Sequence, residues 1–302
     1  MKDKNIKNNK EKKIITPNEC STERWLAALT VGMLIGVIGA IPFEPYLENR
    51  VDTIMGITYA DFFGMLHFIP LFVGAAVALW LLAKTSLKDF ILGVGGKVNK
   101  KACLIITGLY AIGFAIPILS TVSNIHLRGV KAEHFAFLVV FMVLTTWVQT
   151  TWEELIFRGF AIRYVCKNNV GYTKRSLVAA VISSLIFALM HIANPEVTSQ
   201  SGINTLIAVL SYSIPGIVFC LADLHFGNLL PGIIMHWLNN FLSFTIISSD
   251  TSVLPVPTLF LDTTPKNAVL ILISNLVTCL PVMVYILVDS IKQKRKVSAP
   301  LQ

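Results

Sequence analysis

The chain has 302 residues, of which 54% are hydrophobic and only 14% charged, and its mean hydropathy is +0.69. This composition leaves little room for a soluble domain and is typical of a protein that lies within a membrane. The formal net charge of +8 would also suit nucleic acid, but the basic residues are distributed as in a membrane protein, so no nucleic-acid partner is expected.

Eight apolar segments have about the length of a transmembrane helix, which needs roughly 17–25 residues. The fourth is so long that we expect it to be tilted, kinked or extended beyond the bilayer. The segments far exceed the ~10-residue strands of a membrane barrel. We therefore predict an all-α polytopic membrane protein with about eight transmembrane helices. The predicted spans are 25–43, 59–83, 102–120, 136–165, 176–193, 203–224, 229–248 and 267–289.

The N-terminal residues 1–24 carry seven Lys and Arg and are predicted to form a disordered cytoplasmic tail. The apolar segment that follows is longer than the core of a signal peptide and offers only a weak cleavage site, so we expect an uncleaved first helix. In this helix, Gly32 and Gly36 have the spacing that permits close packing against another helix, within the chain or in a second copy.

The distribution of Lys and Arg indicates the topology. With both termini in the cytoplasm, twenty of these residues fall on the cytoplasmic side and four on the outer side. This asymmetry follows the positive-inside rule and predicts an even number of spans. The predicted domains are the tail at 1–24, a transmembrane domain at 25–289 and a second basic cytoplasmic tail at 290–302.

Two adjacent glutamates, Glu153 and Glu154, interrupt the fourth apolar segment. A carboxylate within a membrane costs about 2.5–3.5 kcal/mol on insertion scales, so it seldom occurs without a use. Glu154 and Arg158 are four residues apart, which predicts an ion pair on one helix face. Glu153 has Phe157 rather than a base at its i+4 position. It is therefore predicted to lack a partner in its own helix and to be available as a general base for water.

The fifth and seventh segments carry further polar residues. The fifth contains His191 and is predicted to end near Pro195, and the seventh contains His236 and Asn240 on one helix face. At 1.5 Å per residue, Glu153, His191, His236 and Asn240 lie about 18, 22, 10 and 16 Å from the cytoplasmic ends of their helices. Four polar groups from three helices are thus expected to converge.

Three motifs occur in order on separate predicted helices: Glu-Glu-x-x-x-Arg at 153–158, Phe-x-x-x-His at 187–191 and His-x-x-x-Asn at 236–240. Together they resemble the CPBP family of intramembrane proteases (CAAX proteases and bacteriocin-processing enzymes, also called the Abi family), over about residues 140–245. The resemblance implies an eight-helix fold in which Glu153 activates a water molecule that His191 helps to hold.

The same resemblance gives His236 and Asn240 water-binding or oxyanion-stabilising roles, and it makes Glu154 and Arg158 supporting residues. Eukaryotic members of the family trim prenylated CaaX tails, whereas bacterial members are linked to peptide maturation, bacteriocin immunity or anchoring. The predicted function is therefore an intramembrane endopeptidase that cleaves a membrane-associated or prenylated-type peptide. Its expected partners are membrane lipids and that substrate.

A possible metal site involves three of these residues. Glu153, His191 and His236 match a His2Glu zinc set, although the sequence has no His-Glu-x-x-His segment. The expected cofactor is thus either none or a divalent metal such as zinc. The five cysteines are scattered and imply neither a disulfide framework nor a metal site.

Two other functions fit the same residues. A catalytically silent member would act as a bacteriocin-immunity or scaffold protein, with Glu154–Arg158 as a structural pair and Asn240 joining helices. A proton-coupled transporter would use the carboxylates and histidines as a relay, although the sequence lacks the paired repeats of transporters. A bacterial cytoplasmic membrane is the expected location, because the chain is compact and carries no recognisable organelle-targeting signal.

Overall fold

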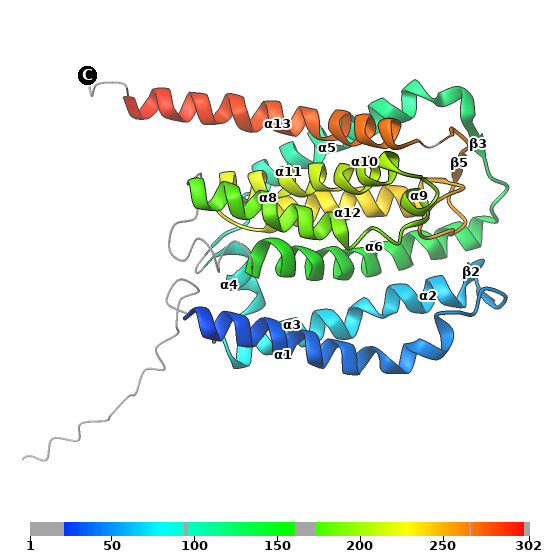
Figure 1. The fold of residues 1–302 in the computed structure, drawn as a ribbon, viewed down its shortest axis with the longest axis horizontal. Helices are drawn as coiled ribbons and strands as arrows, with labels where there is room; N and C mark the ends of the chain where they lie inside the picture. Colours follow the sequence, from blue (N-terminus) through cyan, green and yellow to red (C-terminus); the bar gives the residue numbers. More distant parts are fainter. Residues whose placement is uncertain (1–20, 94–95, 161–172, 266, 299–302) are drawn as a thin grey trace, which may run out of the picture.

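The computed structural model describes residues 21–93, 96–160, 173–265 and 267–298. Its long helices run side by side in one elongated bundle (Figure 1). The first described residues of α1 and the last turns of α13 lie at the same end of this bundle. The predicted N-terminal tail lies outside the described residues as far as residue 20.

The helices and strands follow one another with short connections. The helical elements are α1 (Thr22–Ala40), the 3-10 helix η1 (Ile41–Tyr46), α2 (Tyr59–Leu66), α3 (Phe68–Leu81), α4 (Leu87–Leu92), α5 (Lys100–Ser120), the 3-10 turn η2 (Val122–Asn124), α6 (Ala132–Glu154), the π-helical turn η3 (Leu155–Phe160), α8 (Lys174–Leu189), α9 (Pro195–Thr198), α10 (Ile203–Ser211), α11 (Ser213–Phe226), α12 (Leu230–Thr245) and α13 (Ala268–Ser298). The strands are β1 (Thr53–Ile54), β2 (Ile57–Thr58), β3 (Ile125–Leu127), β4 (Ile247–Ser249) and β5 (Phe260–Asp262).

Six of the eight predicted spans correspond to helices long and apolar enough to cross a membrane, within the residues that the structure describes. They are Glu23–Tyr46, Tyr59–Leu81, Lys100–Ser120, Ala132–Gly159, Ile203–Phe226 and Ala268–Gln293. The remaining two predicted spans correspond to α8 and α12, which have 16 residues each. Such a helix is about 24 Å long, less than the roughly 30 Å of the hydrocarbon core. That α8 and α12 cross the membrane, and that the termini are cytoplasmic, remain predictions.

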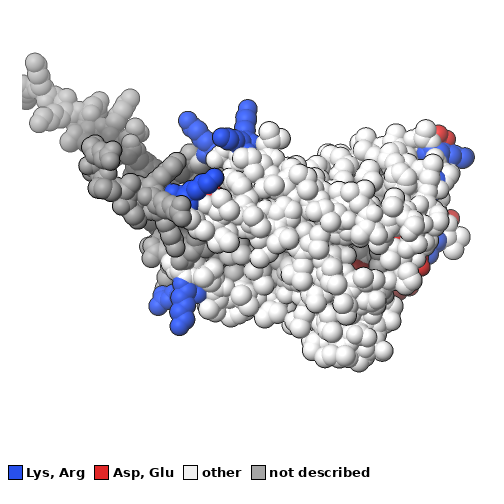
Figure 2. Space-filling view, turned by 90° about the horizontal axis from the view of Figure 1, so that it is seen from above, with Lys and Arg blue, Asp and Glu red and all other residues white. Residues whose placement is uncertain are grey.

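The surface separates charged from apolar residues along the bundle. On the face shown in Figure 2, Lys and Arg gather at the two ends, and the long middle is nearly free of charge. Large apolar side chains are exposed there instead, including Leu104 at 75% and Leu144 at 63%. A belt of this kind requires a lipid environment, so this is an integral membrane protein.

The structure is mostly helical, in agreement with the predicted fold class. The described residues also include five short strands of two or three residues. Strand β5 pairs antiparallel with β3 and parallel with β4, which joins the connection after α5 and the connection after α12 into a small sheet. Helix α13 continues to Ser298, so its last turns lie within the predicted basic tail at 290–302.

The glycines of α1 permit its close contact with α3. A Cβ on Gly36 would lie 2.6 Å from the Cα of Leu71, and one on Gly74 would lie 2.4 Å from the carbonyl oxygen of Gly32. Only hydrogen at these positions allows the two backbones to approach so closely. The predicted glycine packing is therefore found within the chain.

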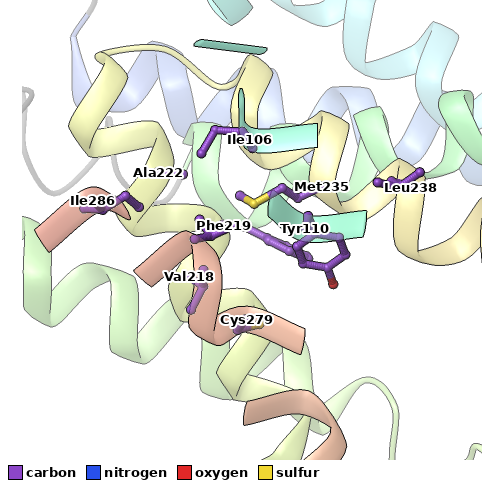
Figure 3. Close-up of a cluster of buried hydrophobic side chains, with 10 residues drawn as sticks. Ile106, Tyr110, Val218, Phe219, Ala222, Met235, Leu238, Cys279 and Ile286 are labelled. Atoms are coloured by element: carbon purple, nitrogen blue, oxygen red, sulfur yellow. The ribbon is translucent and has the colours of Figure 1, made fainter. Parts of the chain in front are cut away.

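Helix α12 lies at the centre of the bundle and packs against α5, α6 and α11. One apolar cluster fixes it there, with Met235 and Leu238 of α12 packed among side chains of α5, α11 and α13 (Figure 3). Met235 and its neighbour His236 are 0% and 4% exposed, respectively. This packing determines where the seventh predicted segment presents its polar side chains.

Candidate active site

The two glutamates are the last residues of α6, where the helix widens into the π-helical turn η3. Turns of this kind are rare and occur often at functional sites. The ion pair predicted from the i,i+4 spacing is present: Arg158 Nη1 lies 2.9 Å from Glu154 Oε1, and both side chains are completely buried. A buried pair of this kind depends on further polar contacts, because the burial of each charge is costly.

His236 of α12 supplies such a contact and links the two glutamates. Its Nδ1 lies 2.8 Å from Glu154 Oε1, and its Nε2 lies 3.3 Å from Glu153 Oε2. Glu154 Oε1 therefore accepts hydrogen bonds from Arg158 and from His236. Because a carboxylate only accepts, Nδ1 of His236 carries the hydrogen. The imidazole thus has one nitrogen bound to Glu154 and the other directed at Glu153.

Glu153 also has a partner in its own helix, contrary to the sequence prediction. The amide Nε2 of Gln149, one turn earlier, donates to Glu153 Oε1 at 3.1 Å. The prediction was based on the residue at i+4, Phe157, and on basic partners alone. Gln149 is a neutral donor at i−4, so it orients the carboxylate without adding a charge. The other oxygen, Oε2, is buried and has no hydrogen-bond partner among the described residues.

Two phenylalanine rings enclose these charged groups. The Arg158 guanidinium carbon lies 4.5 Å from the centre of the Phe187 ring, where cation–π attraction is favourable. The Phe219 ring stacks on His236 with centres 5.4 Å apart, and Phe187 meets His236 edge-on at 5.5 Å. The aromatic walls hold the arginine and the imidazole in fixed orientations and exclude solvent.

His191 approaches the same groups from a turn and not from a helix. Helix α8 ends at Leu189, so the prediction that the helix continues to residue 193 is wrong. Nδ1 of His191 lies 2.8 Å from the carbonyl oxygen of Phe187. The centre of the Phe187 ring lies 4.5 Å from that of His191 and 5.5 Å from that of His236, so the same ring contacts both imidazoles. His191 therefore borders the site.

Asn240 is the predicted residue with the weakest connection to the others. It follows His236 by one helical turn on the same face of α12. Its side-chain oxygen accepts from the amide of Asn239 at 3.2 Å. Asn239 in turn accepts from the hydroxyl of Tyr110 on α5 at 3.2 Å, so Asn239 joins two helices. No hydrogen bond between Asn240 and Glu153 or His236 occurs in the described part of the chain.

Asp223 was missed by the sequence analysis. It lies in the last turn of α11, is 3% exposed, and accepts from the backbone N–H of Gly232 at 2.8 Å. Its carboxylate thereby fixes the first turn of α12, one turn before His236. An aspartate near the end of a predicted span carries the same signal as the glutamate pair, and could have been recognised on that ground.

The predicted zinc set does not have the expected arrangement. Among the described residues, no group of three or more His, Cys, Asp or Glu side chains is placed to hold a metal ion. The nitrogens of His236 are directed at two different carboxylates, and Nδ1 of His191 is bound to a carbonyl oxygen. No step is therefore assigned to a metal ion.

Comparison with known families agrees with the three motifs. Residues 135–242 match the family model described as Rce1-like, type II CAAX prenyl endopeptidase. This part of the chain is therefore similar to a CAAX prenyl endopeptidase. The match contains all seven motif residues and nearly coincides with the predicted core at 140–245. No curated protein matches the chain at a significant level. Within the matched residues, α6, η3, α11 and α12 carry the two glutamates, Arg158, Asp223 and His236.

Proposed function

We propose that the protein is an intramembrane endopeptidase in which Glu153 activates the attacking water. The observation that carries this proposal is the position of His236 between Glu153 and Glu154. A carboxylate at Nδ1 orients an imidazole and stabilises its protonated form, as in hydrolytic triads. The second imidazole nitrogen is then presented to the base that handles the water.

The positions of the protons support this assignment. With the hydrogen of Nδ1 directed at Glu154, Nε2 of His236 and Oε2 of Glu153 face each other at 3.3 Å. Two acceptors at this separation would repel, so a proton resides on one of them or a water molecule lies between them. His236 and Glu153 thus form a unit that stores and returns one proton.

The proposed hydrolysis consists of attack by an activated water molecule followed by release of the leaving nitrogen. Ionised Glu153 removes a proton from water, and the hydroxide oxygen forms a bond to the peptide carbonyl carbon. The resulting oxyanion is stabilised by hydrogen bonds from protonated His236 and from the Asn240 amide. When the carbon–nitrogen bond breaks, Glu153 returns its proton to the leaving nitrogen. Both products leave, and Glu153 is again a carboxylate.

The remaining charged groups preorganise this centre. Arg158 balances the charge of Glu154, and Glu154 holds the ring of His236, so neither needs to touch the substrate. We assign His191 to the attacking water, because its Nε2 is free to accept a hydrogen bond when Nδ1 is bound to Phe187. Fixed dipoles in a site that excludes water stabilise developing charge strongly.

The proposed substrate is a membrane-associated peptide, including one with a prenyl-type tail. Its support is the burial of the site in a bundle whose middle surface is apolar. A bacterial cytoplasmic membrane remains our prediction for the location.

The experiment is the cleavage of a membrane-anchored peptide by the purified protein in bilayers. His236→Ala should lower kcat by about 100-fold or more, the usual contribution of a general acid–base group. The matched control is His126→Ala, because His126 is an exposed histidine on strand β3. An equal loss of kcat in His236→Ala and His126→Ala, or full activity of His236→Ala, would refute the proposal. A silent scaffold would show no cleavage in the wild type either.

A further inference from the structure

His191 lies outside regular helix, so its orientation depends on side-chain contacts. In an α-helix the N–H of residue 191 would bond to the carbonyl of Phe187. Here that N–H donates to the carbonyl of Ala188 at 3.0 Å, and Nδ1 of the imidazole is hydrogen-bonded to the Phe187 carbonyl instead. Because a carbonyl oxygen only accepts, Nδ1 carries the hydrogen and Nε2 is the free nitrogen. This bond fixes one end of the ring only.

Tyr212 supports the face of the same ring. It occupies the break between α10 and α11, and its ring is stacked on His191 with centres 4.5 Å apart and planes inclined by 21°. A flat contact of this kind prevents the imidazole from rotating about its side-chain bonds. Tyr212 has no place in the three motifs or in the chemistry described above.

The phenol of Tyr212 is itself held by two polar side chains. Its hydroxyl donates to Glu196 Oε1, and it accepts from the amide of Asn194 at 3.2 Å. The same amide lies 3.3 Å from Glu196 Oε1, so the three side chains close a ring of hydrogen bonds. These bonds fix the phenol in one orientation over the imidazole.

This arrangement is anchored to the bundle through the short helix α9. Val197, beside Glu196, is completely buried in an apolar cluster with Ala188 of α8 and Val209 of α10. The backbone N–H groups of Val197 and Thr198 both bond to the carbonyl of Asn194 at 2.9 Å. The position of Glu196 is therefore fixed by the protein core and not by the surface.

We propose that Tyr212, anchored by Glu196 and Asn194, is a positioning residue that holds His191 with Nε2 free toward the reaction centre. The effect on rate rests on the proposed protease function, whereas the effect on the imidazole does not. Misplacing a catalytic group by about 1 Å can cost as much as 100-fold in rate. Substrate binding should change little, because Tyr212 acts through His191.

The test compares Tyr212→Leu, which removes the stacked ring, with Tyr212→Phe, which keeps the ring and loses the hydroxyl. Two quantities are measured in bilayers: kcat and KM for a membrane-anchored peptide, and the ¹⁵N NMR signals of His191 in protein labelled on histidine, assigned with His191→Ala. Tyr285→Leu is the control, because Tyr285 is a partly buried tyrosine of α13 outside the site.

For Tyr212→Leu we expect kcat to fall by about 10- to 100-fold with KM within about twofold, and the single Nδ1–H form of His191 to be replaced by mixed tautomers. Tyr212→Phe should retain most of the wild-type kcat and most of the Nδ1–H form of His191. Unchanged His191 signals in Tyr212→Leu would overturn the proposal, whatever happens to kcat. Altered signals with unchanged kcat would overturn the link to catalysis. If the wild type cleaves no peptide, the protease proposal fails, and the NMR comparison still decides whether Tyr212 positions His191.

Discussion

His236 and Glu154 are 82 residues apart in the chain, yet Nδ1 of the histidine lies 2.8 Å from Oε1 of the glutamate. The same glutamate forms a completely buried ion pair with Arg158. This bond connects α12 to the end of α6. It gives Glu154 a structural task, and it leaves Glu153 as the carboxylate that faces the second imidazole nitrogen. The two adjacent glutamates should therefore respond differently to the same substitution.

Glu154→Gln should destabilise the folded protein. It removes the countercharge of Arg158, and breaking a buried pair typically costs about 3–5 kcal/mol. The measurement is thermal unfolding of the purified variant in bilayers. Glu133→Gln in the first turn of α6 is the control, because Glu133 is exposed and should change the melting temperature little. A melting temperature of Glu154→Gln equal to that of the control would contradict the structural role.

Gly216→Ala should push a new methyl group of α11 against the guanidinium of Arg158. A Cβ at residue 216 would lie 2.5 Å from Nη2 of Arg158 and 3.0 Å from the side chain of Ser184. Such overpacking costs about 1–3 kcal/mol. Gly108→Ala in α5 provides the control, because no atom lies within 4 Å of a Cβ there. Thermal unfolding of both variants measures the difference, and equal stability would contradict the close approach of α11 to Arg158.

Asp223→Ala should loosen the start of α12. It leaves the N–H of Gly232 without its acceptor, which costs about 1–3 kcal/mol in a buried site. Asp223→Asn keeps an acceptor oxygen of the same size and should retain more stability than Asp223→Ala. Unfolding of the two variants tests this order, and the reverse order would show that the charge of Asp223, and not its hydrogen bond, is what matters.

Asn239→Ala and Asn240→Ala should separate helix packing from chemistry. Asn239→Ala loses the bond to Tyr110 and should cost about 1 kcal/mol of stability. Asn240→Ala removes a proposed oxyanion donor and should lower kcat by about 100-fold with little change in unfolding. Paired cleavage and unfolding assays decide between these effects. A loss of stability alone in Asn240→Ala would assign Asn240 to packing.

The sequence was sufficient for features that depend on local spacing. Apolar length predicted eight spans, and six of them correspond to described helices long and apolar enough to cross a membrane. The i,i+4 rule predicted the ion pair of Glu154 and Arg158. The resemblance to CAAX proteases, carried by three short motifs, agrees with the family match. These features depend on residues within a few turns of one another.

The remaining features depend on contacts between distant segments. Spacing could not indicate that His236 bridges both glutamates, because the rotation of α12 is set by apolar packing on α5 and α11. Apolar length overestimated α8, which ends at Leu189, where the imidazole of His191 bonds to the carbonyl of Phe187. The partner of Glu153 was missed because Gln149 is a neutral residue at i−4. Asp223 was missed because its acceptor role appears only where α11 meets α12.

Cleavage of a membrane-anchored peptide by Glu153→Gln in bilayers tests the central claim most directly. Glutamine preserves the size of the side chain and can still accept from Gln149, but it cannot take a proton from water. We predict that kcat falls by at least about 100-fold, while the melting temperature stays near that of the wild type. A Glu153→Gln protein that folds normally and cleaves at the wild-type rate would contradict the assignment of Glu153 as the base.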